Sequence, residues 1–204
     1  MTENKKLEIH EGRSRLTIGI SNFNPAVIND AFLIETGFID SLDIVNKDAF
    51  HMSNMGSHIN LLDNCKTQIE SSFREISIAT CETNKIIDFF EILKSSFPYI
   101  NVEKMLYMSV DHIKAPNIKK EFFSSLINTT LMNPTYLEFD LEDYNFTLYE
   151  CAKDKLHLSK SLNSNYDGGQ PITQIDGLKE KYEALDTFFT KFYKNDLGIV
   201  KLSK

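Results

Sequence analysis

The segment FREISIATCETNKIIDFFEILKSSFPYINVEKMLYMSVDH, residues 73–112, decides the predicted fold of this chain. Apolar and polar residues alternate in ISIATC at 76–81 and again in LYMSVD at 106–111. Between them, apolar residues recur at spacings of three and four. Alternation indicates a strand and the wider spacing indicates a helix. The segment therefore predicts a strand, a helix and a second strand.

The helical part of this segment has recognisable ends. Thr83 or Asn84 can cap its first turn, because short polar side chains bond the free amide groups there. Pro98 is predicted to end the helix, because the residue before a proline avoids the helical conformation. The predicted buried stripe between these ends consists of Ile86, Ile87, Phe90, Leu93 and Phe97.

Similar strand signals recur along the chain. They begin at Leu16, Leu42, Ile76, Leu106 and Leu137, at intervals of 26, 34, 30 and 31 residues. A near-constant period in this range is typical of stacked repeats. One strand with one helix cannot bury its apolar face alone, so neighbouring repeats must cover one another. The period therefore predicts an α/β fold, a short β–α solenoid with parallel strands.

The remaining elements are placed by the same rules. Alternation puts Leu16, Ile18 and Ile20 on the buried face of the first strand, and Leu42–Val45 forms the second strand. A further helix, whose first turn Asn117 can cap, is predicted to follow the strand at 106–111. One further predicted helix face consists of Ile59, Leu61, Leu62, Cys65 and Ile69.

The C-terminal part departs from the repeat. Strand-like pieces within 141–158 leave no room for a helix and predict a hairpin that closes the array. A predicted helix at 175–195 carries an apolar stripe at spacings of four and three, which consists of Leu178, Tyr182, Leu185, Phe189 and Phe192. The predicted organisation is a polar tail at 1–14, a repeat domain at 15–162, a loop at 163–173, and an amphipathic helix with its tail at 174–204.

Composition narrows the class of protein. The 204 residues carry a formal net charge of −7 with scattered Lys and Arg, which argues against a nucleic-acid partner. No apolar run reaches the roughly 18 residues that a membrane span needs, and the polar N-terminus does not fit a secretory signal. Cys65, Cys81 and Cys151 are odd in number and far apart. We therefore expect reduced thiols and a cytoplasmic or nuclear location.

Two phrases resemble a known family of repeats. ISIATC at 76–81 fits an apolar-x-apolar-x-x-Cys strand, and FPYINVEKMLYMSV at 97–110 fits a helix end, a proline and a new strand. Both resemble the helix-bearing leucine-rich repeats of the ribonuclease-inhibitor-like and F-box-associated type, over roughly residues 16–141. The resemblance implies parallel strands that line a concave face, and such a face binds another protein.

This register places a set of side chains on the outward strand face as candidates for partner contact. Tyr107 is the predicted anchor, because its ring offers a large area at low entropic cost and ends in a polar group. The acidic end at 135–154 suits a basic partner, or else forms a solubilising rim that protects a strand edge. The candidate residues are Asp43, Ser77, Tyr107, Ser109, Asp111, Glu138, Asp140 and Glu142.

The sequence contains no recognisable catalytic, metal-binding or phosphate-binding motif. The five histidines show no HxxxH or HExxH spacing, no GxSxG segment occurs, and Gly168-Gly169 does not begin a phosphate-binding loop. We therefore predict no catalytic residue, no metal and no cofactor. The predicted function is a non-catalytic protein–protein interaction module. Two alternatives remain open: a compact α/β domain with a small-molecule or enzymatic role, and a structural subunit of a larger complex.

Overall fold

Antiparallel strands make up most of the fold. The computed structural model describes residues 8–46, 48–54, 56–114, 136–141, 144–152 and 155–195. The strands are β1 (Glu8–Ile20), β2 (Phe50–Asn54), β3 (Ser57–Leu62), β4 (Thr67–Ser72), β5 (Glu75–Thr80), β6 (Asn101–Lys114), β7 (Tyr136–Leu141), β8 (Tyr144–Ala152) and β9 (Lys155–Pro171). The helices are α1 (Asp30–Glu35), α2 (Ser41–Val45), α3 (Thr83–Ser96) and α5 (Leu178–Asn195), with 3-10 turns η1 (Pro25–Val27) and η2 (Ile172–Gln174).

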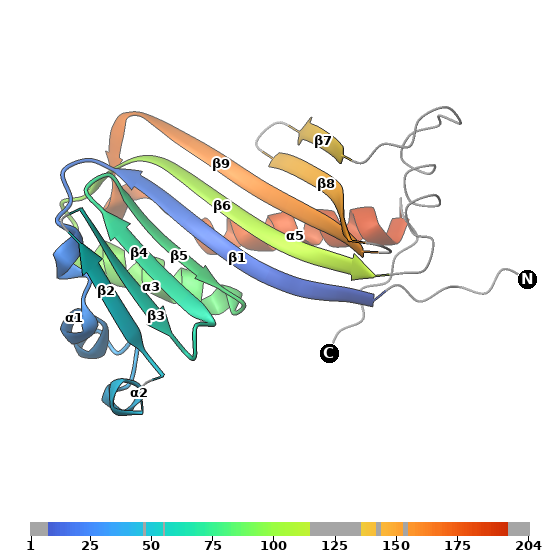
Figure 1. Ribbon diagram of the computed structural model, residues 1–204. Coiled ribbons are helices and arrows are strands. Elements are labelled where there is room, and N and C mark those ends of the chain that lie inside the picture. Colours follow the sequence, from blue (N-terminus) through green and yellow to red (C-terminus); the bar gives the residue numbers. More distant parts are fainter. Residues whose placement is uncertain are drawn as a thin grey trace, which may run out of the picture. The chain divides into compact units, whose positions relative to one another are not determined.

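The strands hydrogen-bond in the order β2-β3-β4-β5-β1-β6-β9-β8-β7 (Figure 1). The pairs β1–β5, β2–β3, β3–β4, β4–β5, β7–β8 and β8–β9 are all antiparallel. Short turns join several of these pairs, whereas parallel neighbours need a crossover of a dozen or more residues. The predicted parallel solenoid is therefore wrong, and so is the resemblance to leucine-rich repeats, from which a role as an adaptor would have followed.

The segment at 73–112 shows why the apolar pattern led to a wrong prediction of strand pairing. It does form a strand, a helix and a strand, namely β5, α3 and β6. However, β1 lies between β5 and β6 in the sheet, so these two strands are not neighbours as a repeat would require. The local elements were predicted correctly and their pairing was not.

Two predicted elements have a different secondary structure. Leu42–Val45, expected as a strand, lies in helix α2, where Asp40 and Asp43 form a reciprocal capping box. The predicted helix face from Ile59 to Ile69 is instead the hairpin of β3 and β4. Its turn contains Asp63, Asn64 and Cys65 at positive φ. The predicted helix from Asn117 lies outside the described residues.

The chain divides into two compact units. The first unit consists of Arg13–Met108 and Asn163–Leu178, and the second consists of Met1–Gly12, Ser109–Leu162 and Lys179–Lys204. The chain passes between them within β1, β6 and β9 and again at the start of α5. Each unit has its own buried side chains.

The first unit is built on one apolar face of its strands. Leu16, Ile18 and Ile20 of β1 are all at most 2% exposed, as their alternation predicted. Helix α3 packs against β5 and lies on one face of these strands (Figure 1). Its fully buried side chains are Ile86, Phe89, Phe90 and Leu93. The predicted stripe of α3 is therefore largely confirmed, with Phe89 added and Ile87 only half-buried.

The second unit contains a buried ion pair beneath α5. The Lys160 amine lies 3.5 Å from a carboxylate oxygen of Asp111 and 3.1 Å from one of Asp186. Lys160 and Asp111 are 3% and 1% exposed. The stacked rings of Phe146 and Phe189, 5.4 Å apart, lie beside this pair, since the amine is 5.6 Å from the Phe189 centroid.

We predict that Lys160→Ala lowers the free energy of unfolding by about 3–5 kcal/mol, because it leaves a buried carboxylate uncompensated. Asp186→Ala removes the exposed partner, whose side chain is 59% accessible, and should cost about 1 kcal/mol or less. Urea unfolding of the two variants measures the difference. Equal losses would contradict the assignment of Asp111 as the partner that matters.

Candidate functional site: a polar hollow of the first unit

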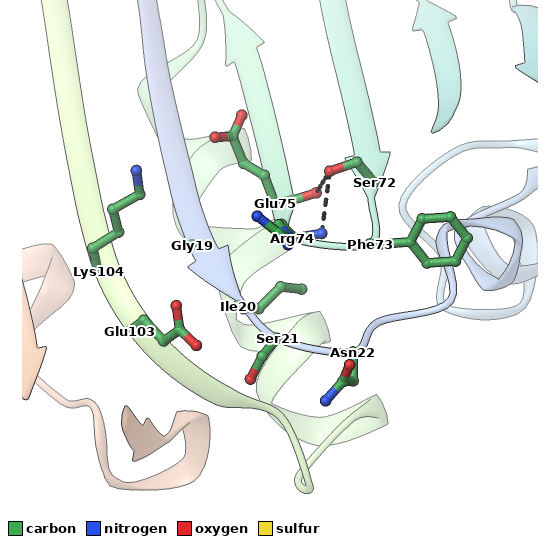
Figure 2. A pocket seen from close by; sticks show the side chains of 10 residues that line it. All are labelled: Gly19, Ile20, Ser21, Asn22, Ser72, Phe73, Arg74, Glu75, Glu103 and Lys104. Atoms are coloured by element: carbon green, nitrogen blue, oxygen red, sulfur yellow. Dashed lines mark hydrogen bonds between the residues drawn. The ribbon is translucent and has the colours of Figure 1, made fainter. Parts of the chain in front are cut away.

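A hollow of about 650 Å³ lies where β1 leaves the sheet of the first unit. Three segments line it: the end of β1 with the residues after it at 19–22, the β4–β5 turn at 72–75, and residues 103–104 of β6 (Figure 2). Strand β1 is the middle element, because it pairs with β5 on one side and β6 on the other. The hollow is therefore set by the position of β1.

Backbone hydrogen bonds hold the β4–β5 turn against the chain that follows β1. The Ile20 amide donates to the Arg74 carbonyl at 2.9 Å, and the Phe23 amide donates to the Phe73 carbonyl at 3.2 Å. Ser72 closes the turn, since its hydroxyl donates to the Glu75 carbonyl at 3.3 Å and accepts from the Arg74 amide at 3.4 Å (Figure 2). The turn therefore presents its side chains from a fixed backbone.

Gly19 makes room for the Lys104 side chain. A Cβ atom placed on Gly19 would lie 2.5 Å from Cγ and 2.8 Å from Cε of Lys104. The lysine stem from β6 thus passes directly over β1. Glu75 is the register partner of Gly19 on β5, and Figure 2 shows Lys104 and Glu75 on either side of Gly19.

The charges around the hollow are balanced. Arg74 and Lys104 supply two cationic groups, and Glu75 and Glu103 supply two carboxylates. The side chains of 21, 22 and 72 add two hydroxyls and an amide. Such a lining can bind a polar ligand that carries both donors and acceptors.

Phe73 gives the hollow an apolar rim. Its side chain is 53% exposed although it is large and aromatic. Aromatic residues and arginine are the residue types enriched at protein interfaces and among their energetic centres. Phe73 and Arg74 are adjacent at the turn, and Figure 2 shows their side chains leaving it in different directions.

Among the residues that the structure describes, two titratable groups have shifted pKa values, and neither lines the hollow. Burial lowers the pKa of Lys85, but the hydrogen bond and charge of Asp63, together with Glu82, outweigh this and raise it overall. Burial raises the pKa of Tyr166, while a hydrogen bond with Ser164 acts in the opposite direction.

The structure does not bring the predicted contact residues together. Four of them lie inside the fold: Tyr107, Ser109, Asp111 and Ser77 are 6%, 9%, 1% and 2% exposed. The Tyr107 hydroxyl lies 3.3 Å from the Ser14 hydroxyl, and Asp111 pairs with Lys160. The side chain expected as an anchor is therefore a core residue.

The other four predicted residues are dispersed. Asp43 belongs to the capping box of α2 rather than to a strand. Glu138 is exposed on β7, where its carboxylate accepts a hydrogen bond from the side-chain amide of Asn145 at 3.1 Å. Asp140 also lies on β7, but its side chain is outside the described part of the chain, as is all of Glu142.

Sequence reasoning missed the turn at 72–75. A signal was available, because Thr67, Ile69 and Ser71 alternate with polar residues just before it and a turn-forming Asp63-Asn64 pair precedes them. The apolar spacing from Ile59 to Ile69 was interpreted as helical instead. The hairpin, and with it Phe73 and Arg74, therefore went unnoticed.

Comparisons with known proteins add little to this geometry. No family model matches the chain, and no curated protein matches it. A solved structure titled "Methanococcus jannaschii TBP" is similar with a TM-score of 0.29 and 15% sequence identity, over 90% of this chain and 98% of that one. A likeness at that score carries no argument about what this chain does.

No helix in the described ranges is long and apolar enough to cross a membrane. Within the same residues, no group of three or more His, Cys, Asp or Glu side chains is placed to hold a metal ion.

We predict that Gly19→Ala lowers the free energy of unfolding by about 1–3 kcal/mol, because Cγ of Lys104, which is close to the lysine backbone, has to move away from the new Cβ. Gly37→Ala is the matched control. Nothing lies within 4 Å of its new Cβ, but its φ of +71° strains any side chain, so a loss of about 1 kcal/mol is expected. Urea unfolding compares the two, and an unchanged free energy of unfolding for Gly19→Ala would contradict the close approach of Lys104 to Gly19.

Proposed function

We propose that this chain is a non-catalytic protein-interaction module that binds its partner with the hollow of the first unit and the turn at 72–75. The observation that supports it most is the exposed Phe73 next to Arg74, on a turn whose backbone is held by Ile20 and Phe23. A fixed turn loses little conformational freedom on binding, so more of the contact energy is kept.

The partner that suits this surface is a folded protein with a polar loop and an apolar contact for Phe73. The hollow offers two positive and two negative groups, so it favours a loop that carries both signs of charge. The overall charge of −7 gives no electrostatic advantage for nucleic acid. A protein partner is therefore the better match.

Two other surfaces considered from the sequence are less suited to this role. The apolar stripe of α5 is occupied within the fold, since Leu178, Tyr182, Leu185 and Phe189 are at most 6% exposed. The acidic stretch contributes exposed Glu138 among the residues whose side chains are described. These observations move the expected contact surface to the turn.

The test is affinity capture from the native cell extract with three baits: the intact chain, a Phe73→Ala/Arg74→Ala variant, and Tyr99→Ala. Tyr99 is also a large exposed aromatic residue, at 71% accessibility, but does not line the hollow. The proposal expects a protein that is captured by the intact chain and by Tyr99→Ala and lost with the double variant.

The captured protein is then purified and its affinity measured by calorimetry. Loss of two central interface residues should weaken binding by about 2 kcal/mol or more. If the double variant binds as tightly as the intact chain, the turn is not the contact surface.

The small-molecule alternative rests on the same hollow, whose volume is within the range of ligand pockets. A thermal-shift screen of metabolites distinguishes the two. A ligand that raises the melting temperature of the intact chain and of the Phe73→Ala/Arg74→Ala variant, but not of Lys104→Ala, would favour the alternative.

A further inference from the structure

Exposed apolar residues gather at one end of the sheet of the first unit. In the part of the chain that the structure describes, four of the seven exposed large apolar side chains fall within residues 42–52. Leu42 and Val45 lie on α2 at 60% and 74% exposure, and Phe50 and Met52 lie on β2 at 56% and 46%. Such gathering marks an interaction surface more often than scattered apolar residues do.

Strand β2 is also the terminal strand at this end of the sheet. It pairs with β3 on one side, and no described strand pairs with its other edge. A terminal strand presents unpaired amide and carbonyl groups that can accept a further strand. Backbone groups and apolar side chains are therefore available at the same place.

The two ends of the described sheet differ in protection. Strand β7, at the other end of the order, has the sequence YLEFDL with Glu138 and Asp140. Charged residues on an edge strand oppose pairing with another chain, and two copies of β7 would set like charges together. Strand β2 has the sequence FHMSN, with no acidic residue, lysine, arginine or proline. Strand β2 therefore lacks the charged residues and the proline that often protect an edge strand.

We propose that β2 is a homodimer contact, in which β2 of two copies of the chain pair antiparallel about a two-fold axis at Met52. This register places Met52 opposite its own copy and Phe50 opposite Asn54 of the second copy. The cross-strand pairs Phe50–Leu61 and Met52–Ile59 lie on one face. The contact therefore continues an apolar row, Ile59–Met52, into the same row of the second copy.

A second copy fits this edge better than a charged peptide does. Two-fold pairing requires a strand that is complementary to itself, and the central Met52 with neutral flanking residues meets that requirement. Strand β2 itself has no Asp, Glu, Lys or Arg with which to select a charged ligand. Each copy carries a formal net charge of −7, so the copies repel each other at long range. Added salt should therefore strengthen the dimer by screening that repulsion.

Sedimentation velocity of the intact chain over roughly two decades of concentration tests the contact, because interfaces this small bind weakly. The expected result is a concentration-dependent dimer that strengthens with salt. Met52→Lys should weaken it by about tenfold or more, since like charges directly opposite each other oppose strand pairing. Tyr99→Lys makes the same charge change at an exposed aromatic residue outside β2 and should leave the dimer unchanged.

Position-specific cross-linking tests the register. In a background with the three native cysteines changed to serine, Met52→Cys should form a disulfide-linked dimer on mild oxidation. Directly opposite Cβ atoms lie about 4.5–5.5 Å apart and need to approach by only about 1 Å to reach the separation that a disulfide spans. Ser53→Cys is the matched control, since Ser53 would face His51 of the second copy. Urea unfolding midpoints close to that of the intact chain show that the variants fold.

A chain that stays monomeric at every concentration and salt level overturns the proposal. So does a dimer that Met52→Lys leaves intact, or cross-linking that is equal at 52 and 53. None of these outcomes bears on the turn at 72–75, which the capture experiment tests separately.

Discussion

The pairing of β1 with two partners is the constraint on which the first unit depends. Its register with β5 runs from Ser14↔Thr80 to Gly19↔Glu75, and β6 occupies its other side. Since β5 and β6 are joined through α3, the inserted β1 separates them and leaves one apolar face to be covered. Leu16, Ile18 and Ile20 supply that face. The burial of three aliphatic side chains on a central strand is a large stabilising contribution, of the order of several kcal/mol.

The hollow follows from the end of the same strand. After Ile20 the chain leaves the sheet, but the amides of Ile20 and Phe23 still pair with the turn between β4 and β5. The hydrogen-bond ladder thus extends beyond the last register pair, and the turn cannot swing away from β1. Gly19 then lets Lys104 approach from the other neighbour. Three segments that are distant in sequence meet there because β1 touches all of them.

Local periodicity predicted the elements that have strong patterns. Strands β1, β5 and β6 and helices α3 and α5 were all expected near their observed positions. Periodicity does not specify which strands pair, because pairing depends on the fit between segments far apart in the chain. The insertion of β1 between β5 and β6 could therefore not be predicted from local periodicity. The helix at 41–45 was missed because four residues of alternation cannot outweigh a capping box.

The predicted outward orientation of Tyr107 was wrong for a different physical reason. Val102 and Met105 are both buried, and the two residues between them, Glu103 and Lys104, are both exposed. Two successive exposed residues interrupt the alternation, so the buried positions of β6 shift to Met105 and Tyr107. The strand was assumed to alternate from Leu106, which inverts its faces. The same irregularity brings Lys104 close to Gly19. One break in the alternation of β6 therefore explains both the inverted prediction of its buried face and the position of Lys104 at the hollow.

The acidic residue at 111 shows how charge can mislead in a sequence. In LYMSVD it looked like an outward carboxylate, but its charge is matched by Lys160 from β9 inside the second unit. A buried pair gives little net stability, yet it penalises any arrangement that separates its members. Asp186 and Phe189 lie one turn apart on α5 and both meet the Lys160 amine. A shift of α5 along its axis would break both contacts, so the buried charge selects the position of the helix rather than a partner.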